Sequence, residues 1–121
     1  MPKNILVIDD DGMVTKSLCS FLAKSGYITD SAETGYEGLE KIKDTHLDLI
    51  VIDIRMPGLN GVETAKKIKE ILKSKNIPEV PILFITGYTD SKENILAQEI
   101  GEVIFKPFNN QDFLECIRKY L

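Results

Sequence analysis

Carboxylates that could hold a metal ion follow two apolar runs of the sequence. Asp9, Asp10 and Asp11 come directly after the first run, and Asp53 comes directly after a later one. Clustered carboxylates repel one another, and a hard cation such as Mg²⁺ or Mn²⁺ removes that repulsion while leaving coordination positions open for phosphate oxygens. We therefore expect Asp9, Asp10 and Asp53 to bind Mg²⁺ or Mn²⁺. Asp53 could then attack a phosphoryl group, because carboxylates can form aspartyl phosphates.

Two more polar residues follow apolar runs and suit the same chemistry. The hydroxyl of Thr86 could donate a hydrogen bond to a phosphoryl oxygen, and Lys106 could neutralise another. Each residue also has an ordinary structural interpretation, and Asp11 before Gly12 is typical of a helix N-cap. Together these residues favour a site, because independent caps need not converge on one edge of a fold.

The elements that would position these residues alternate along the chain. Four β-branched runs without polar alternation indicate strands buried on both faces of a parallel sheet: 5–8, 49–52, 82–85 and 103–105. A weaker run at 27–29 has polar surroundings typical of an edge strand.

Helical periodicity fills the gaps between the strands. Apolar stripes start at Val14, Val62 and Phe113, and shorter helices are predicted over 37–43 and 92–100. Strand and helix alternate five times, which predicts a single α/β domain over 1–121 with a five-stranded parallel sheet and helices on both faces. In such sheets ligands bind beyond the carboxyl ends of the strands, where the polar residues lie.

Composition excludes several classes of protein. The 121 residues are 43% hydrophobic and 28% charged, which is ordinary for a globular domain, and the longest uncharged apolar runs are too short to span a membrane. The net charge of −4 argues against direct nucleic-acid binding. Cys19 and Cys116 are too few for a disulfide framework and are expected to be inert thiols in a reducing cytoplasm. No role is expected for His46.

The sequence resembles the receiver domain of two-component response regulators over essentially its whole length. The pieces that carry the resemblance are ILVIDDDG at 5–12, GYITDSAETGYEGLEKI at 26–42, DLIVIDIRMPGLNGVE at 48–63, PILFITGY at 81–88 and FKPF at 105–108. The third piece is the most specific. The resemblance implies a flavodoxin-like fold with strand order 2-1-3-4-5.

The resemblance also implies a role for each residue of the metal site. Asp53 matches the phosphoacceptor and Asp10 the carboxylate that ligates the metal directly. Asp9 matches a carboxylate that reaches the metal through water, and Arg55 stands where a backbone carbonyl ligates it.

Four further positions match the family. Thr86 matches the switch hydroxyl and Lys106 the phosphoryl-binding lysine. The bond before Pro107 falls where a cis peptide is common. Gly61 matches a turn glycine, for which we expect a positive φ.

Two features near the fifth strand depart from the family. Val103 stands where the family usually has a Tyr or Phe that changes rotamer on phosphorylation, and the loop after Gly101 is shorter than usual. Phe105 lies on the same strand face but is an imperfect substitute. The signal could instead pass through the loop 86–88 and the helix 92–100.

The implied function is a phosphoacceptor in a phosphorelay rather than a dedicated enzyme. A sensor histidine kinase or a histidine phosphotransfer protein would donate the phosphoryl group. The switching face of the fourth helix, fifth strand and fifth helix would meet a downstream protein target or a second copy in a homodimer. Neither a membrane nor nucleic acid is an expected direct partner. Slow self-dephosphorylation is expected, with Arg55 and Tyr88 setting its rate.

Two alternatives belong to other functional classes. A haloacid-dehalogenase-type phosphatase would use Asp9 as nucleophile and Asp11 as acid/base, with Thr86 and Lys106 binding phosphate, but it leaves Asp53 unexplained. A docking module without phosphate chemistry would have no need of the carboxylate cluster.

Overall fold

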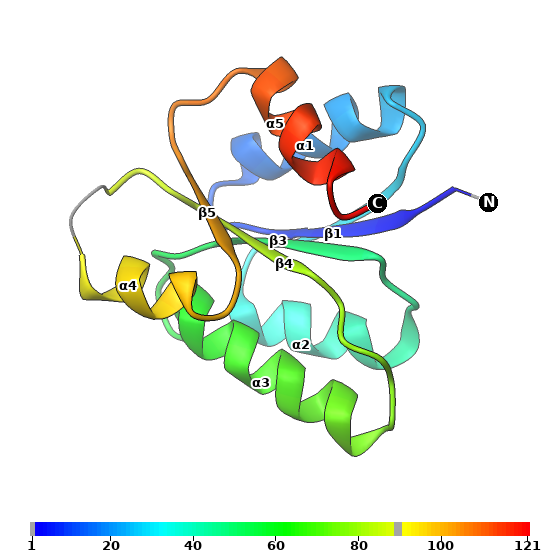
Figure 1. Cartoon of the computed structure of the whole chain (residues 1–121), viewed down its shortest axis with the longest axis vertical. Coiled ribbons are helices and arrows are strands. Elements are labelled where there is room, and N and C mark those ends of the chain that lie inside the picture. Colours follow the sequence, from blue (N-terminus) through cyan, green and yellow to red (C-terminus); the bar gives the residue numbers. More distant parts are fainter. Residues whose placement is uncertain (1, 89–90) are drawn as a thin grey trace.

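Five strands alternate with five helices in the computed structural model, which describes residues 2–88 and 91–121 (Figure 1). The elements, in chain order, are β1 Asn4–Ile8, α1 Gly12–Lys24, β2 Ile28–Ala32, α2 Gly35–Asp44, β3 Leu49–Asp53, α3 Gly61–Ser74, β4 Ile82–Thr86, α4 Lys92–Gln98, β5 Glu102–Phe105 and α5 Asn110–Arg118.

The strands form one parallel sheet in the order β2-β1-β3-β4-β5, which confirms the predicted topology. Helices α1 and α5 cover one face of the sheet, and α2, α3 and α4 cover the other (Figure 1). Each face has its own apolar core, because successive strand residues point to opposite faces: Leu6 and Ile8 belong to one core, and Ile5 and Val7 belong to the other. Every residue of β3 and β4 is buried.

The edge strand β2 differs most from its predicted extent. It pairs with β1 from Ile28 opposite Asn4 to Ala32 opposite Ile8. Its exposed and half-buried residues alternate before the buried Ala32. Backbone pairing with β1 carries the strand through the polar residues Asp30 and Ser31, whose side chains predict no strand.

Side-chain caps define where the helices begin. Asp11 caps α1 by accepting a hydrogen bond from the backbone N–H of Met13, which confirms its predicted N-cap role. Asn60 and Glu63 form a reciprocal capping box at the start of α3, each accepting from the other's backbone N–H. These caps mark where the loops that follow β1 and β3 end.

The expectation of a positive φ at Gly61 is wrong. The left-handed glycine of that turn is Gly58, with φ of 75°. Gly61 is required for space instead, because a Cβ there would overlap the carbonyl oxygen of Asp53 and lie 2.8 Å from the Cα of Ile54. Backbone contact between the end of β3 and the start of α3 is therefore what demands glycine at position 61.

No helix in the described part of the chain is long and apolar enough to cross a membrane. Cys19 and Cys116 are free thiols, half-buried and buried respectively. Burial raises the pKa of each thiol, that of Cys116 to about 11.

Candidate functional site

Three carboxylates meet at the carboxyl edge of the sheet. Ile8 of β1 lies opposite Ile52 of β3, so Asp9, the residue directly after β1, lies beside Asp53, the last residue of β3. Asp9, Asp10 and Asp53 each offer one oxygen, and these oxygens lie within 4.8 Å of one another. Asp9 and Asp53 are buried, whereas Asp10 is exposed at the mouth of the cluster.

Lys106 reaches this cluster from the end of β5. Its Nζ donates a hydrogen bond to Oδ2 of Asp9 at 3.1 Å and lies 3.7 Å from Oδ1 of Asp53. The peptide bond between Lys106 and Pro107 is cis, as predicted. The structure therefore brings Lys106 together with the buried carboxylates that the sequence analysis grouped with it.

The carboxyl group of Asp53 is poorly stabilised as an anion. Burial raises its pKa most, the charge of Asp9 raises it further, and Lys106 opposes both, so that the pKa rises to about 7. A single ammonium group thus leaves part of the negative charge of the cluster uncompensated. An additional cation bound to the carboxylate oxygens would stabilise the ionised form of Asp53.

Asp11 does not belong to the cluster. Its side chain caps α1, while its backbone N–H donates to Oδ1 of Asp9 at 3.0 Å. Among the described residues, the group that could hold a metal ion contains Asp9, Asp10 and Asp53. This arrangement gives Asp11 a structural role and lacks the free acid/base that the phosphatase alternative requires.

Thr86 lies at the same edge of the sheet. Ile85 is the register partner of Asp53, so Thr86 stands one residue beyond it at the end of β4. Its side chain is fully buried, and its hydroxyl oxygen accepts a hydrogen bond from the backbone N–H of Tyr88 at 3.1 Å. The hydroxyl can still donate a hydrogen bond of its own.

Arg55 and Tyr88 lie together beyond Asp53 and Thr86. The Cζ atom of Arg55 lies 4.1 Å from the centroid of the Tyr88 ring, within the range of a cation–π contact. Both side chains are exposed. The role expected for the backbone carbonyl of Arg55 as a metal ligand stays a prediction.

Val103 is half-buried and packs against the core shared by α2, α3 and α4. Its register partner is Phe84, whereas Phe105 is the partner of Thr86 and is 39% exposed. Phe105 therefore lies nearer the carboxyl edge of the sheet, where the carboxylates meet, than Val103 does.

Sequence reasoning missed Asn94. This residue of α4 is buried and donates a hydrogen bond from Nδ2 to the backbone carbonyl of Tyr88 at 2.6 Å. Because Tyr88 also donates to Thr86, one chain of hydrogen bonds joins the end of β4 to α4. The sequence signal that could have indicated Asn94 is its place three positions after Ser91, the N-cap of α4. The backbone N–H of Asn94 donates to the Ser91 hydroxyl oxygen.

Comparisons with known proteins agree with this geometry. Residues 5–118 match the family model described as the response regulator receiver domain. The transcriptional regulatory protein CpxR homolog of Haemophilus influenzae is 30% identical over 119 residues, which cover 97% of this chain and 49% of that protein. The polar-differentiation response regulator DivK of Brucella ovis is 28% identical, with 100% of this chain and 98% of DivK covered. The chain spans about half the length of the first curated relatives that it matches.

The solved structures include the response regulator protein TrrA of Thermotoga maritima in complex with Mg²⁺ and BeF. It matches with a TM-score of 0.85 and 33% identity, covering 98% of this chain and 99% of TrrA.

Proposed function

The chain belongs to the response regulator receiver domain family, and on that premise we propose that Asp53 accepts a phosphoryl group from a phosphohistidine of a partner protein. The partner is a sensor histidine kinase or a histidine phosphotransfer protein. The observation that carries the proposal is the cluster of Asp9, Asp10 and Asp53 with Lys106 against its buried members. In this step an Asp53 oxygen bonds to phosphorus, the phosphorus–nitrogen bond breaks, and its electron pair stays on the imidazole.

The residues at the site fit a hard divalent cation. Asp9, Asp10 and Asp53, together with the backbone carbonyl of Arg55, would hold Mg²⁺, which would offset negative charge on the phosphoryl oxygens. The complex of the similar protein TrrA with Mg²⁺ and BeF supports this choice of metal. Lys106 would bind one phosphoryl oxygen by charge, and the Thr86 hydroxyl would donate a hydrogen bond to another.

The output is a change in a protein-binding face rather than a catalysed reaction. Phosphorylation would engage the Thr86 hydroxyl and bias the hydrogen-bonded chain from Thr86 through Tyr88 to Asn94, shifting α4 between two states. This route uses no aromatic residue at Val103. A downstream protein or a second copy would read the face of α4, β5 and α5. Slow hydrolysis of the aspartyl phosphate would reset the domain.

Phosphorylation with acetyl phosphate and Mg²⁺ tests the assignment. Intact mass spectrometry should find one added phosphoryl group on the wild type and none on Asp53→Asn. Asp11→Asn should still be phosphorylated, because Asp11 caps a helix outside the cluster. Phosphorylation that survives Asp53→Asn but is lost in Asp11→Asn would favour the phosphatase-like chemistry at Asp9 and Asp11 and contradict the proposal.

A further inference from the structure

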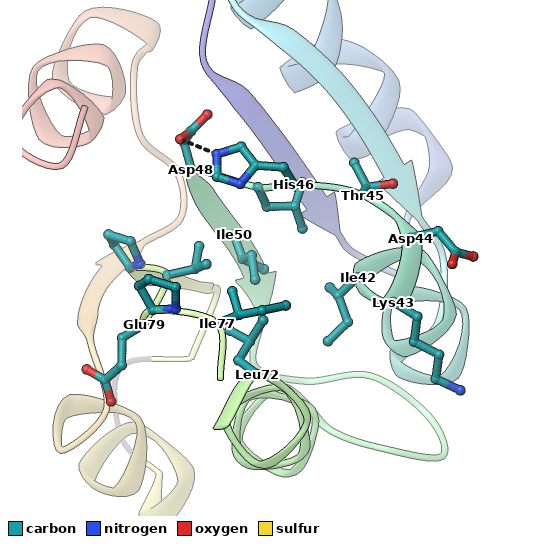
Figure 2. Close-up of a pocket in the computed structure, with 14 residues that line it drawn as sticks. Ile42, Lys43, Asp44, Thr45, His46, Asp48, Ile50, Leu72, Ile77 and Glu79 are labelled. Atoms are coloured by element: carbon teal, nitrogen blue, oxygen red, sulfur yellow. Dashed lines mark hydrogen bonds and ion pairs between the residues drawn. The ribbon is translucent and has the colours of Figure 1, made fainter. Parts of the chain in front are cut away.

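A pocket of about 470 Å³ opens at the sheet edge opposite the carboxylate cluster. It lies at the amino ends of β3 and β4, beside the carboxyl ends of α2 and α3. Figure 2 shows Ile42, Ile50, Leu72 and Ile77 pointing toward one another around this space, with charged side chains at the periphery. The volume falls in the range of small-molecule sites.

The walls of the pocket are apolar and largely pre-formed. Ile42, Ile50 and Leu72 belong to the buried core, while Ile77 also lines the pocket and is 38% exposed. The segment that carries Ile77 follows Asn76, which has a φ of 56°, and contains Pro78 and Pro81, which have no backbone N–H to offer a ligand. The apolar walls therefore suit the apolar body of a ligand.

The side chains that line the rim are acidic on balance, and Nζ of Lys75 is a further positive group beside them, at the carbonyl of Lys43. The carboxylates of the rim are Asp44, Asp48 and Glu79, against Lys43 and the imidazole of His46. Lys43 is paired with Glu40 outside the pocket at 2.9 Å, and Glu79 lies 3.6 Å from Lys69.

The two rim carboxylates Asp48 and Asp44 differ in the partners that the structure gives them. The backbone N–H of Asn4 donates to Oδ2 of Asp48 and holds its pKa below the ordinary value, with His46 at its other oxygen. Asp44 is exposed and makes no ion pair within residues 2–88 and 91–121. A positive group at the rim would therefore meet Asp44 without displacing a partner.

The end of α2 adds hydrogen-bond acceptors at the same place. Thr45, its C-cap residue, has an extended backbone with φ of −127° and ψ of 130°. In the part of the chain that the structure describes, no backbone N–H caps the last turn of α2, and the donor that does reach it is Nζ of Lys75, at 3.1 Å from the carbonyl of Lys43. The carboxyl end of a helix carries partial negative charge and attracts cations.

We propose that this pocket binds a small molecule with an apolar body and one primary ammonium group. The apolar body lies against Ile42, Leu72 and Ile77. The ammonium group lies at the rim, where it can donate to the free carbonyls of α2 and is attracted by Asp44. A carboxylate on the same body would be repelled by the same groups. The site is separate from the carboxylate cluster and does not depend on phosphorylation.

Titration of the isotope-labelled chain with three matched probes tests the proposal: 2-phenylethylamine, 3-phenylpropionate and 2-phenylethanol. We expect saturable shifts of the Ile42, Leu72 and Ile77 methyl signals, with the amine binding at least about fivefold more tightly than the carboxylate. Equal affinity for amine and carboxylate, or shifts that never saturate or that spread over the whole surface, would overturn it.

Two variants separate the roles of wall and rim. Asp44→Lys should weaken binding of the amine about fivefold and leave binding of the alcohol unchanged. Glu115→Lys makes the same charge change at an exposed position of α5, and it should leave the binding of both probes unchanged. Ile77→Ser should weaken binding of the amine and of the alcohol to the same extent. Because Ile77 is partly exposed, the variant should still fold, and the dispersion of its NMR spectrum checks this. If a folded Ile77→Ser chain binds the amine as the wild type does, the pocket is not the site.

Discussion

The ammonium nitrogen of Lys106 lies 3.1 Å from Oδ2 of Asp9, although 97 positions separate the two residues in the chain. The same nitrogen lies 3.7 Å from Asp53, so one positive charge serves two buried carboxylates. The ammonium group donates its hydrogen bond to Asp9, so it offsets the negative charge of Asp53 less fully. Burial of Asp53 raises its pKa most and the charge of Asp9 raises it further, while Lys106 only partly opposes both, so that the pKa rises to about 7.

Stability without metal should therefore fall as Asp53 ionises. The pKa of Asp53 is about 7 in the folded state, against 3.8 without the fold, so the folded chain binds the proton more tightly. The free energy of unfolding should decrease between about pH 4 and pH 7, by up to about 4 kcal/mol, and level off above that range. Urea unfolding in EDTA measures it, and Asp53→Asn should lack this component. Parallel pH profiles of wild type and Asp53→Asn would contradict the assignment.

Mg²⁺ should stabilise the fold, and more strongly above the pKa of Asp53 than below it. Mg²⁺ competes with the proton for Asp53, so the affinity of the site for Mg²⁺ should fall about tenfold per pH unit below about pH 7. Thermal unfolding with and without Mg²⁺, at about pH 8 and about pH 5.5, should show the larger rise in Tm at the higher pH. Asp10→Asn should reduce the rise, because it removes one of the three carboxylates. An unchanged wild-type Tm at the higher pH would mean that the cluster does not bind Mg²⁺.

Gly61→Ala should destabilise the chain by about 1–3 kcal/mol, because the added methyl group overlaps the backbone of Asp53 and Ile54. Gly87→Ala is the matched control, since a Cβ at Gly87 has no atom of the described structure within 4 Å, and its effect should stay within about 1 kcal/mol. Chemical denaturation of both variants measures the difference. Equal stability of the two would show that the contact at Gly61 relaxes without cost.

The exposed pair of Arg55 and Tyr88 should set the lifetime of the aspartyl phosphate. The guanidinium lies over the ring at 4.1 Å, and the pair stands two residues beyond Asp53 and Thr86, where we expect it to restrict the approach of water. Replacing both residues with alanine should speed loss of the phosphoryl group by about threefold or more. Phosphate release after removal of the donor measures this rate, with exposed Lys67→Ala as control. An unchanged rate in the double variant would refute this role.

The buried strands were predictable because β3 and β4 consist of apolar residues without alternation, which only a doubly covered sheet can bury. The limits of the edge elements were less predictable. Strand β2 runs through polar residues because its pairing with β1 carries it, and α4 ends at Gln98 rather than at residue 100. For β2 the deciding contacts come from another strand, whereas α4 ends in a turn where the backbone N–H groups of Ile100 and Gly101 both donate to the carbonyl of Ala97.

The sequence by itself determined the chemistry available at the carboxyl edge of the sheet. Residue types and their places after apolar runs indicated carboxylates, a hydroxyl and a lysine at one edge, because parallel strands bring their ends together. Only the tertiary structure decided that Lys106 bonds to Asp9, that Gly61 is needed for space, that Arg55 stacks on Tyr88, and that an apolar pocket opens at the opposite edge. These features depend on distances between side chains that lie far apart in the chain or on different loops, and local patterns of hydrophobicity do not encode such distances.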